Sequence, residues 1–165
     1  DYGIMKCDAP TIPPMILRGV LLDIAAYKGL EHVPANYGVT AEDIEECAKW
    51  EGVELREKDC VLVRLGETWP ALDNCPGAGM TLEAARCLVD DMVAFEMNHA
   101  DGTMSWPNHP HPVHHYCLDQ MGVHFIEAVQ MDELAKDKCY EFCFMAAPNK
   151  IKGGTGMFIR PIAIV

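Results

Sequence analysis

Five of the seven histidines lie within residues 109–127, a stretch that ends in a single acidic residue inside an apolar run. Imidazole and carboxylate groups are the usual protein ligands of zinc, manganese and iron(II). Neighbouring side chains on a helix point in different directions, so at most one or two of these histidines can serve one site. The residue types in this stretch therefore indicate a metal site or a catalytic histidine.

Two ordinary interpretations compete with a metal site. A histidine-rich segment is often a solvated loop, and an acid within an apolar strand often pairs with an arginine. Arg64 and Arg18 lie in apolar runs and are the candidates to pair with Glu127, the acid that ends the stretch. The metal interpretation requires instead that a helix ending at Gly122 brings His114 beside Glu127.

Other reactive residues give weaker signals. Cys117 follows His114 by three positions, so a Cys–His nucleophile pair is conceivable, but no signature of a cysteine hydrolase surrounds it. Ser105 is the only serine in the sequence, and no Gly-x-Ser-x-Gly motif contains it. The glycine-rich residues 153–156 precede an expected strand rather than a helix, which favours a tight turn over a phosphate-binding loop.

The size and charge of the chain limit its class. With 165 residues, half of them hydrophobic, residues 1–165 are expected to form a single domain. The net charge of −12 argues against nucleic acid or an anionic membrane as a partner, since both require a basic surface. No apolar run approaches the length of about 18 residues that spans a membrane. The eight cysteines include no Cys-x-x-Cys, which favours reduced thiols in a cytoplasmic protein.

Apolar runs and capping signals predict an α/β domain in which strands alternate with helices. The expected strands are Met15–Ile24, Cys60–Leu65, Met92–Met97, Val123–Ala128, Cys139–Ala147 and Met157–Val165. The expected helices are Thr40–Trp50, Leu82–Asp90, Val113–Met121 and Met131–Lys136. Gly19 is expected to break the first strand, and residues 27–37 are expected to form a loop.

Several short motifs follow one another in a specific order. They are Arg18-Gly-Val-Leu-Leu-Asp-Ile-Ala, Asp59-Cys-Val-Leu-Val-Arg-Leu-Gly, Pro112-Val-His-His-Tyr-Cys-Leu, Gly122-Val-His-Phe-Ile-Glu and Lys150-Ile-Lys-Gly-Gly-Thr-Gly. In this order they resemble the putative cyclase family of metal-dependent hydrolases, which includes bacterial kynurenine formamidase and isatin hydrolase. The resemblance implies a swivelling β/β/α cyclase-like fold that is missing its N-terminal segment, so that the chain would be the C-terminal two thirds of such a hydrolase.

The resemblance also implies a reaction and its residues. Members of the family hydrolyse the C–N bond of a small amide or lactam with a metal-activated water. By this resemblance His114 and Glu127 are metal ligands, and His115 is either the alternative ligand or a general base. The implied cofactor is a divalent metal, zinc or manganese, with iron as a further candidate.

The family's main metal motif, His-x-Gly-Thr-His-x-Asp, does not occur in these 165 residues. We therefore expect a second polypeptide to supply that motif, and a homo- or hetero-oligomer that acts on a small-molecule substrate. Trp69, Trp106 and Phe125 are candidates to line an aromatic pocket, and the competing interpretation, which we prefer, is ordinary packing for each of them. The alternatives are a non-catalytic binding or scaffold protein on the same fold with the metal site lost, or a ring-closing enzyme.

Overall fold

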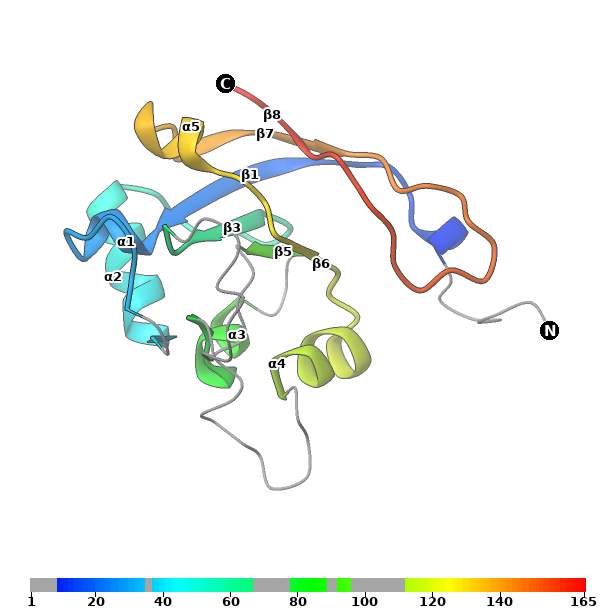
Figure 1. The fold of residues 1–165 in the computed structure, drawn as a ribbon, viewed down its shortest axis with the longest axis horizontal. Helices are drawn as coiled ribbons and strands as arrows, with labels where there is room; N and C mark the ends of the chain where they lie inside the picture. The colour runs from blue at the N-terminus through cyan, green and yellow to red at the C-terminus, as the bar shows by residue number, and fades with distance from the viewer. Residues whose placement is uncertain (1–8, 35–36, 67–77, 89–91, 96–111) are drawn as a thin grey trace.

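A six-stranded mixed sheet forms the centre of the computed structural model, which describes residues 9–34, 37–66, 78–88, 92–95 and 112–165. Its strand order is β6-β5-β3-β1-β7-β8 (Figure 1). Their bounds are β1 Met15–Asp23, β3 Cys60–Arg64, β5 Met92–Phe95, β6 Phe125–Glu127, β7 Glu141–Ala146 and β8 Ile162–Ile164. β1, β3, β5 and β6 run parallel, whereas β7 is antiparallel to β1 and β8 is antiparallel to β7. β2 (Gly38–Val39) and β4 (Gly79–Met80) form a separate parallel pair.

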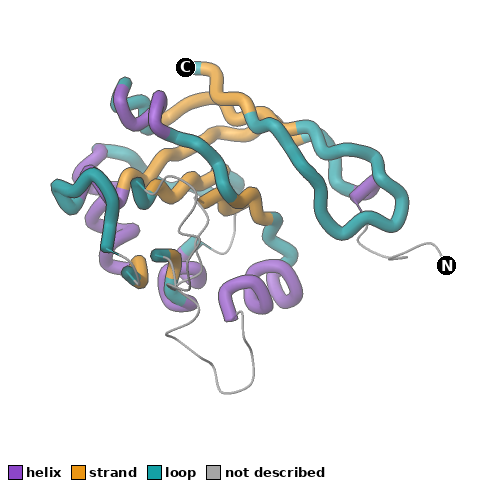
Figure 2. The backbone as a smooth tube through the Cα atoms, viewed as in Figure 1, coloured by secondary structure: helices purple, strands orange, loops and turns teal. Residues whose placement is uncertain are grey.

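Helices cover both faces of this sheet, as the tube in Figure 2 shows. They are η1 Ala9–Thr11, α1 Ile24–Tyr27, α2 Ala41–Glu51, α3 Leu82–Cys87, α4 Pro112–His114, the π-helix η3 His115–Met121 and α5 Asp132–Lys136. In the view of Figure 1, α2, α3 and α4 lie below the sheet and α5 lies above it. The predicted α/β class is confirmed. Among the described residues, no helix is long and apolar enough to cross a membrane.

The central strands are mostly apolar, and the second half of β1 and most of β3 are buried on both faces of the sheet. In β1, Val20 and Leu22 point into the hydrophobic cluster between the sheet and the helices α2 and α3, which also contains Ile44. Leu21, between them in sequence, enters the cluster on the opposite face, with Phe144. This alternation follows from the two-residue period of a strand and explains why the continuous apolar runs predicted the central strands correctly.

Gly19 does not break the first strand, so that prediction was wrong. β1 continues through Gly19, whose register partner in β7 is Phe142. A Cβ atom at Gly19 would overlap the ring of Phe142. The absence of a side chain at Gly19 therefore leaves room for the aromatic ring of Phe142 on the neighbouring strand.

The start of α2 follows the predicted capping box. Thr40 Oγ1 accepts a hydrogen bond from the Asp43 N–H at 3.1 Å, and Asp43 Oδ2 accepts one from the Thr40 N–H at 3.0 Å. Lys28 Nζ lies 2.5 Å from Asp43 Oδ1, which ties the segment after α1 to the same carboxylate. Gly52 ends the helix in the left-handed conformation, with φ of 73°.

Several predicted boundaries were wrong. Residues 27–37 are not all loop, because α1 includes Tyr27. The expected strand Met157–Val165 is reduced to β8, which begins after Pro161, a residue that has no N–H to give to the ladder. The expected helix Val113–Met121 begins at Pro112 and changes to a π-helix at His115. Residues 89–91 and 96–97, at the ends of two expected elements, lie outside the described residues.

Candidate functional site

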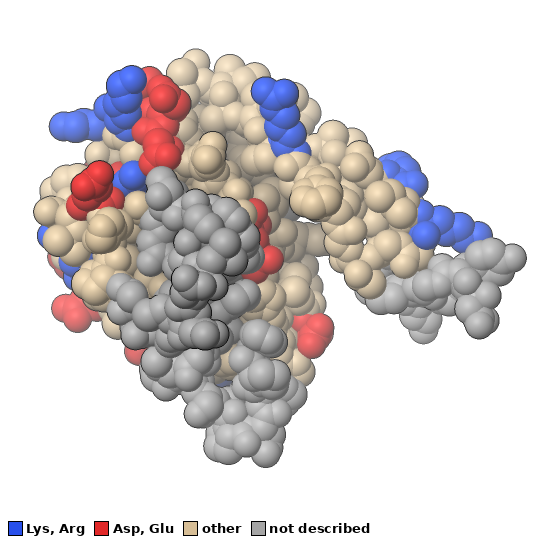
Figure 3. Space-filling model, in the orientation of Figure 1, with Lys and Arg blue, Asp and Glu red and all other residues tan. Residues whose placement is uncertain are grey.

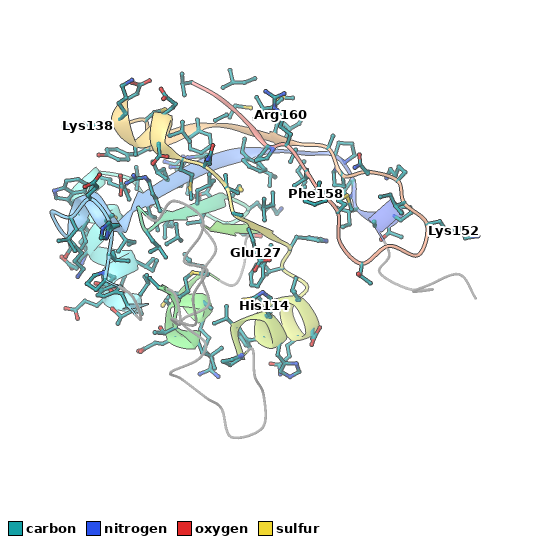
Figure 4. The ribbon with its side chains drawn as sticks, viewed as in Figure 1. His114, Glu127, Lys138, Lys152, Phe158 and Arg160 are labelled. Atoms are coloured by element: carbon teal, nitrogen blue, oxygen red, sulfur yellow. The ribbon has the colours of Figure 1, made fainter. Side chains whose placement is uncertain are left out.

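His114 and Glu127 lie side by side at one end of the sheet. His114 is the last residue of α4, and Glu127 is the last residue of β6. His114 Nε2 is 2.9 Å from Glu127 Oε1, and the two side chains are 24% and 33% exposed. Figure 4 shows them pointing toward each other from the helix and the strand. The pair is therefore close and partly shielded, but water can still reach it.

The end of the π-helix brings the two residues together. Cys117 is fully buried and fixes η3 against the core. Its carbonyl accepts hydrogen bonds from the N–H groups of Gly122 and Val123, the latter at 2.8 Å. Gly122 has φ of 68°, so the chain reverses there and returns along β6 to Glu127. A π-helix is rare and occurs frequently at functional sites.

Phe125 holds the His114 ring edge-on. The two ring centroids are 5.1 Å apart and their planes meet at 88°, a favourable edge-to-face arrangement. Phe125 thus contacts His114, the candidate metal ligand, as a residue of an aromatic pocket around the site would. Trp69 and Trp106, the other two residues predicted for that pocket, lie outside the described residues.

His115 points to partners on its own helix. Its Nδ1 is 2.9 Å from Asp119 Oδ2, and its Nε2 is 3.1 Å from Gln120 Nε2. An amide nitrogen donates, which favours the tautomer in which Nε2 accepts from Gln120 and Nδ1–H donates a hydrogen bond to Asp119. This is how a carboxylate orients a histidine general base. Asp119 and Gln120 were not predicted. The four-residue spacing from His115 to Asp119 could have suggested the first, whereas the five-residue spacing to Gln120 brings side chains together only in a π-helix.

Both arginines that were candidates to pair with Glu127 have carboxylate partners elsewhere. Arg18 Nη1 lies 2.6 Å from Asp59 Oδ2. Arg64 lies 3.1 Å from Asp23 and 2.8 Å from Asp132. Glu127 instead faces a histidine, the arrangement that the metal interpretation required.

Of the other reactive groups, neither Cys117 nor the glycine-rich segment forms a competing site, and Ser105 lies outside the described residues. Cys117 is buried within the core, which does not suit an attacking thiol. Gly153–Gly156 lies in a turn where the Gly154 N–H donates to the Ile151 carbonyl at 3.1 Å. Lys150 Nζ donates to the carbonyls of Pro10 and Ile12, so it anchors the segment before β1. The turn interpretation of the glycine-rich segment is confirmed.

The donor types suit a divalent ion. The 2.9 Å between His114 Nε2 and Glu127 Oε1 is a hydrogen-bond distance. Two donors on one tetrahedral ion lie about 3.3 Å apart, so the pair would have to separate slightly to hold an ion. Within the described residues, however, no group of three or more His, Cys, Asp or Glu side chains could hold an ion. This pair supplies two donors, whereas a tetrahedral site needs four. His99, His109 and His111 lie outside the described residues.

The putative cyclase family model matches residues 4–103 of the sequence, more than half of the chain. The chain belongs to this family. The match ends before His114 and Glu127, so the family assignment does not itself test these two residues. A search of curated proteins found no match.

Solved structures reproduce the cyclase fold over nearly the whole chain. A crystal structure described as a novel cyclase is 30% identical with a TM-score of 0.75, and the match covers 92% of this chain and 54% of that one. Isatin hydrolase A from Labrenzia aggregata, bound to benzyl benzoate, is 23% identical with a TM-score of 0.68 and coverages of 94% and 63%. A predicted metal-dependent hydrolase from Bacillus stearothermophilus is 21% identical with a TM-score of 0.61 and coverages of 90% and 63%.

These matches confirm the cyclase-like fold. The chain spans only about half to two thirds of the length of each of these three structures. At identities of 23% and 21%, the two hydrolase structures are evidence for the fold alone.

Proposed function

We propose that this member of the cyclase family forms part of a metal-dependent hydrolase that cleaves the C–N bond of a small amide or lactam. The observation that carries the proposal is the contact between His114 Nε2 and Glu127 Oε1 at 2.9 Å. It joins one imidazole and one carboxylate in a partly shielded position. The names of two structural neighbours, an isatin hydrolase and a metal-dependent hydrolase, support the same chemistry.

His114 and Glu127 would hold zinc or manganese, with iron(II) as a further candidate, because all three accept mixed nitrogen and oxygen ligands. A divalent ion in such a site lowers the pKa of its bound water and polarises the carbonyl under attack. Phe125 restrains the ring of His114 by its edge-to-face contact. Glu127 is held by its position as the last residue of β6, which pairs with β5.

His115 is the proposed general base. If Nδ1–H donates a hydrogen bond to Asp119, the lone pair of Nε2 is the group able to take a proton. In the structure Gln120 donates to that nitrogen at 3.1 Å. Gln120 would have to turn away to let Nε2 act on a water. Its exposed position on η3 permits this movement.

The remaining ligands would come from another segment. In the proposal, a second polypeptide carries His-x-Gly-Thr-His-x-Asp and completes the coordination of the ion in a homo- or hetero-oligomer. The observation that supports further ligands is that the described residues bring only this pair of candidate donors together.

Hydrolysis of N-formyl aromatic amines and lactams, isatin among them, tests the proposal on native material supplied with each divalent ion. We expect metal-dependent turnover that falls by about 100-fold or more in His114→Ala and Glu127→Gln, because each removes a ligand. Glu133→Gln, which changes an exposed acid on α5, is the matched control and should keep full activity. Equal activity in all variants would contradict the proposal, and product analysis would separate hydrolysis from ring closure.

The second candidate is a non-catalytic binding protein on the same fold. The observation in its favour is that no three candidate ligands meet within the described part of the chain. This alternative predicts that native material turns over none of these substrates with any metal. It also predicts that no polypeptide carrying the missing motif accompanies the chain.

A further inference from the structure

The residue after Glu127 has a backbone conformation that residues other than glycine rarely adopt. Ala128 has φ of 56°, in the left-handed region. It begins the β6–α5 segment, defined here as residues 128–131, which connects the end of β6 with the start of α5. In Figure 1 this segment, drawn in yellow, rises from β6 to α5 above the sheet. A strained conformation persists only where the surrounding structure holds it, so the contacts that fix this segment bear on the placement of Glu127.

β6 alone is a weak support for Glu127. The strand has three residues, Glu127 is the last of them, and among the described strands its one neighbour is β5. The ends of short edge strands open more readily than the centre of a sheet. A metal ligand, in contrast, has to stay within about 0.5 Å of its place. Further contacts are therefore needed to keep Glu127 beside His114.

Two contacts fix the far end of the β6–α5 segment. Met131 is buried in the same hydrophobic cluster as Ile126 and Phe144. The next residue, Asp132, accepts a hydrogen bond from Arg64 Nη2 at 2.8 Å. Arg64 is the last residue of β3, which lies beyond β5 in the sheet. The chain after Glu127 is thus tied to a strand nearer the centre of the sheet than β6 is.

Arg64 is itself held firmly from its other side. Asp23 is its register partner in β1 and is buried. Arg64 Nη1 donates to the two carboxylate oxygens of Asp23 at 3.1 and 3.2 Å, whereas Nη2 donates to Asp132. A guanidinium can hold two carboxylates in this way because its donors form a rigid planar fork, unlike the single ammonium group of lysine. Arg64 therefore joins the centre of the sheet to the first residue of α5.

We propose that Arg64 and Asp132 are positioning residues for Glu127. Their ion pair holds the β6–α5 segment against β3, and the segment in turn keeps the carboxylate of Glu127 beside His114. Arg64 thus acts on Glu127 through Asp132 and the backbone rather than as its ion-pair partner. The inference rests on the proposed function, in which His114 and Glu127 bind the metal.

Two substitutions break the contact without removing the support of the sheet. The Asp132 side chain is 56% exposed, so Asp132→Asn removes its charge without leaving an unpaired buried group. Arg64→Lys keeps a positive charge for Asp23 but loses the fork that reaches Asp132. The matched control is Glu133→Gln, because Glu133 is the next residue of α5 and its side chain is 87% exposed. Figure 3 shows acidic and basic side chains together over α5, so the control alters the same charged surface.

The dissociation constant of the native material for zinc, and separately for manganese, tests the inference by competition with a chromogenic chelator. We expect the constant to rise about tenfold in Asp132→Asn and in Arg64→Lys, as for other groups that orient metal ligands, and to stay unchanged in Glu133→Gln. The double variant should bind no more weakly than Arg64→Lys alone, because both changes break one contact. In the metal-free protein, the backbone amides of residues 127–131 should exchange hydrogen faster in both single variants. Circular dichroism checks that each variant is folded.

His114→Ala separates this inference from the proposed function. If the native material binds neither ion, or if His114→Ala binds as tightly as the native protein, the proposed metal site is wrong and the positioning role falls with it. If His114→Ala weakens binding but Asp132→Asn and Arg64→Lys keep the native constant, only the positioning role is overturned. Native exchange rates at residues 127–131 in Asp132→Asn, or equal weakening in Glu133→Gln, would also overturn it.

Discussion

His114 Nε2 lies 2.9 Å from Glu127 Oε1 where a helix end meets a strand end. Glu127 is the register partner of Phe95, and both end parallel strands. Ligand sites of open α/β sheets lie outside the carboxyl ends of their parallel strands. The contact is therefore located where the topology of this sheet favours chemistry, and it joins two residue types that bind divalent metals.

Replacing Gly19 should destabilise the protein through the neighbouring strand. In Gly19→Ala the new methyl group overlaps the Phe142 ring, so the ring or β7 must shift. We expect the free energy of unfolding in urea to fall by about 1–3 kcal/mol. Gly156→Ala is the matched control, because its added methyl group meets no atom within 4 Å. Equal losses of unfolding free energy in the two variants would show that the overlap with the Phe142 ring does not determine the cost.

Glu51 should make stability depend on pH. Its Oε1 accepts a hydrogen bond from the Asp23 N–H at 2.8 Å, near the end of α2. Burial disfavours the charged carboxylate and raises the pKa of Glu51 from 4.5 to about 7. The folded state thus binds a proton more tightly than the unfolded state. The contribution of protonated Glu51 to the free energy of unfolding is fully present below pH 4.5 and is lost as the pH rises through 7.

Glu51→Gln removes this titration. We expect the variant to gain stability relative to the native protein as the pH rises from 4.5 to 7. After allowance for solvent screening, the gain in the free energy of unfolding should reach roughly 1–2 kcal/mol at pH values above 7. Urea unfolding at a series of pH values measures it. Glu45→Gln, on the exposed face of the same helix, should retain the native pH dependence. Parallel curves for the native protein and Glu51→Gln would contradict the assignment.

Asp119 should fix the tautomer of His115. The two contacts favour the tautomer with the proton on Nδ1, in which Asp119 accepts a hydrogen bond from Nδ1–H and Gln120 donates one to Nε2. In Asp119→Ala that acceptor is lost, so the population with the proton on Nε2 should increase. Long-range proton–nitrogen NMR correlations of the imidazole report the two forms directly. Glu133→Ala serves as the control, and an unchanged tautomer in Asp119→Ala would refute the orienting role.

The sequence predicted the central architecture because strong local signals agreed with the packing. Continuous apolar runs located β1 and β3, which are buried on both faces, and the Thr40–Asp43 capping box located α2. The pairing of β2 with β4 was not predicted. Each has only two residues, and tertiary contact rather than propensity decides whether such segments pair.

The candidate site was predicted only in part. Residue types identified His114 and Glu127, and the structure shows their side chains in contact, whereas their role as ligands stays a prediction. The π-helix was not predicted, because its wider hydrogen-bond spacing has no sequence signal in a stretch that reads as an ordinary helix. The role of Gly19 depends on Phe142, more than 120 positions away, so it cannot be read locally.

Intact mass spectrometry of purified native material, followed by elemental analysis of the same sample, tests the central claim most directly. The account predicts a second polypeptide containing His-x-Gly-Thr-His-x-Asp and about one or two divalent ions per pair of chains. His114→Ala and Glu127→Gln should lose metal, while Glu133→Gln should retain it. A single polypeptide that carries neither the motif nor a metal ion would contradict the account and favour the non-catalytic alternative.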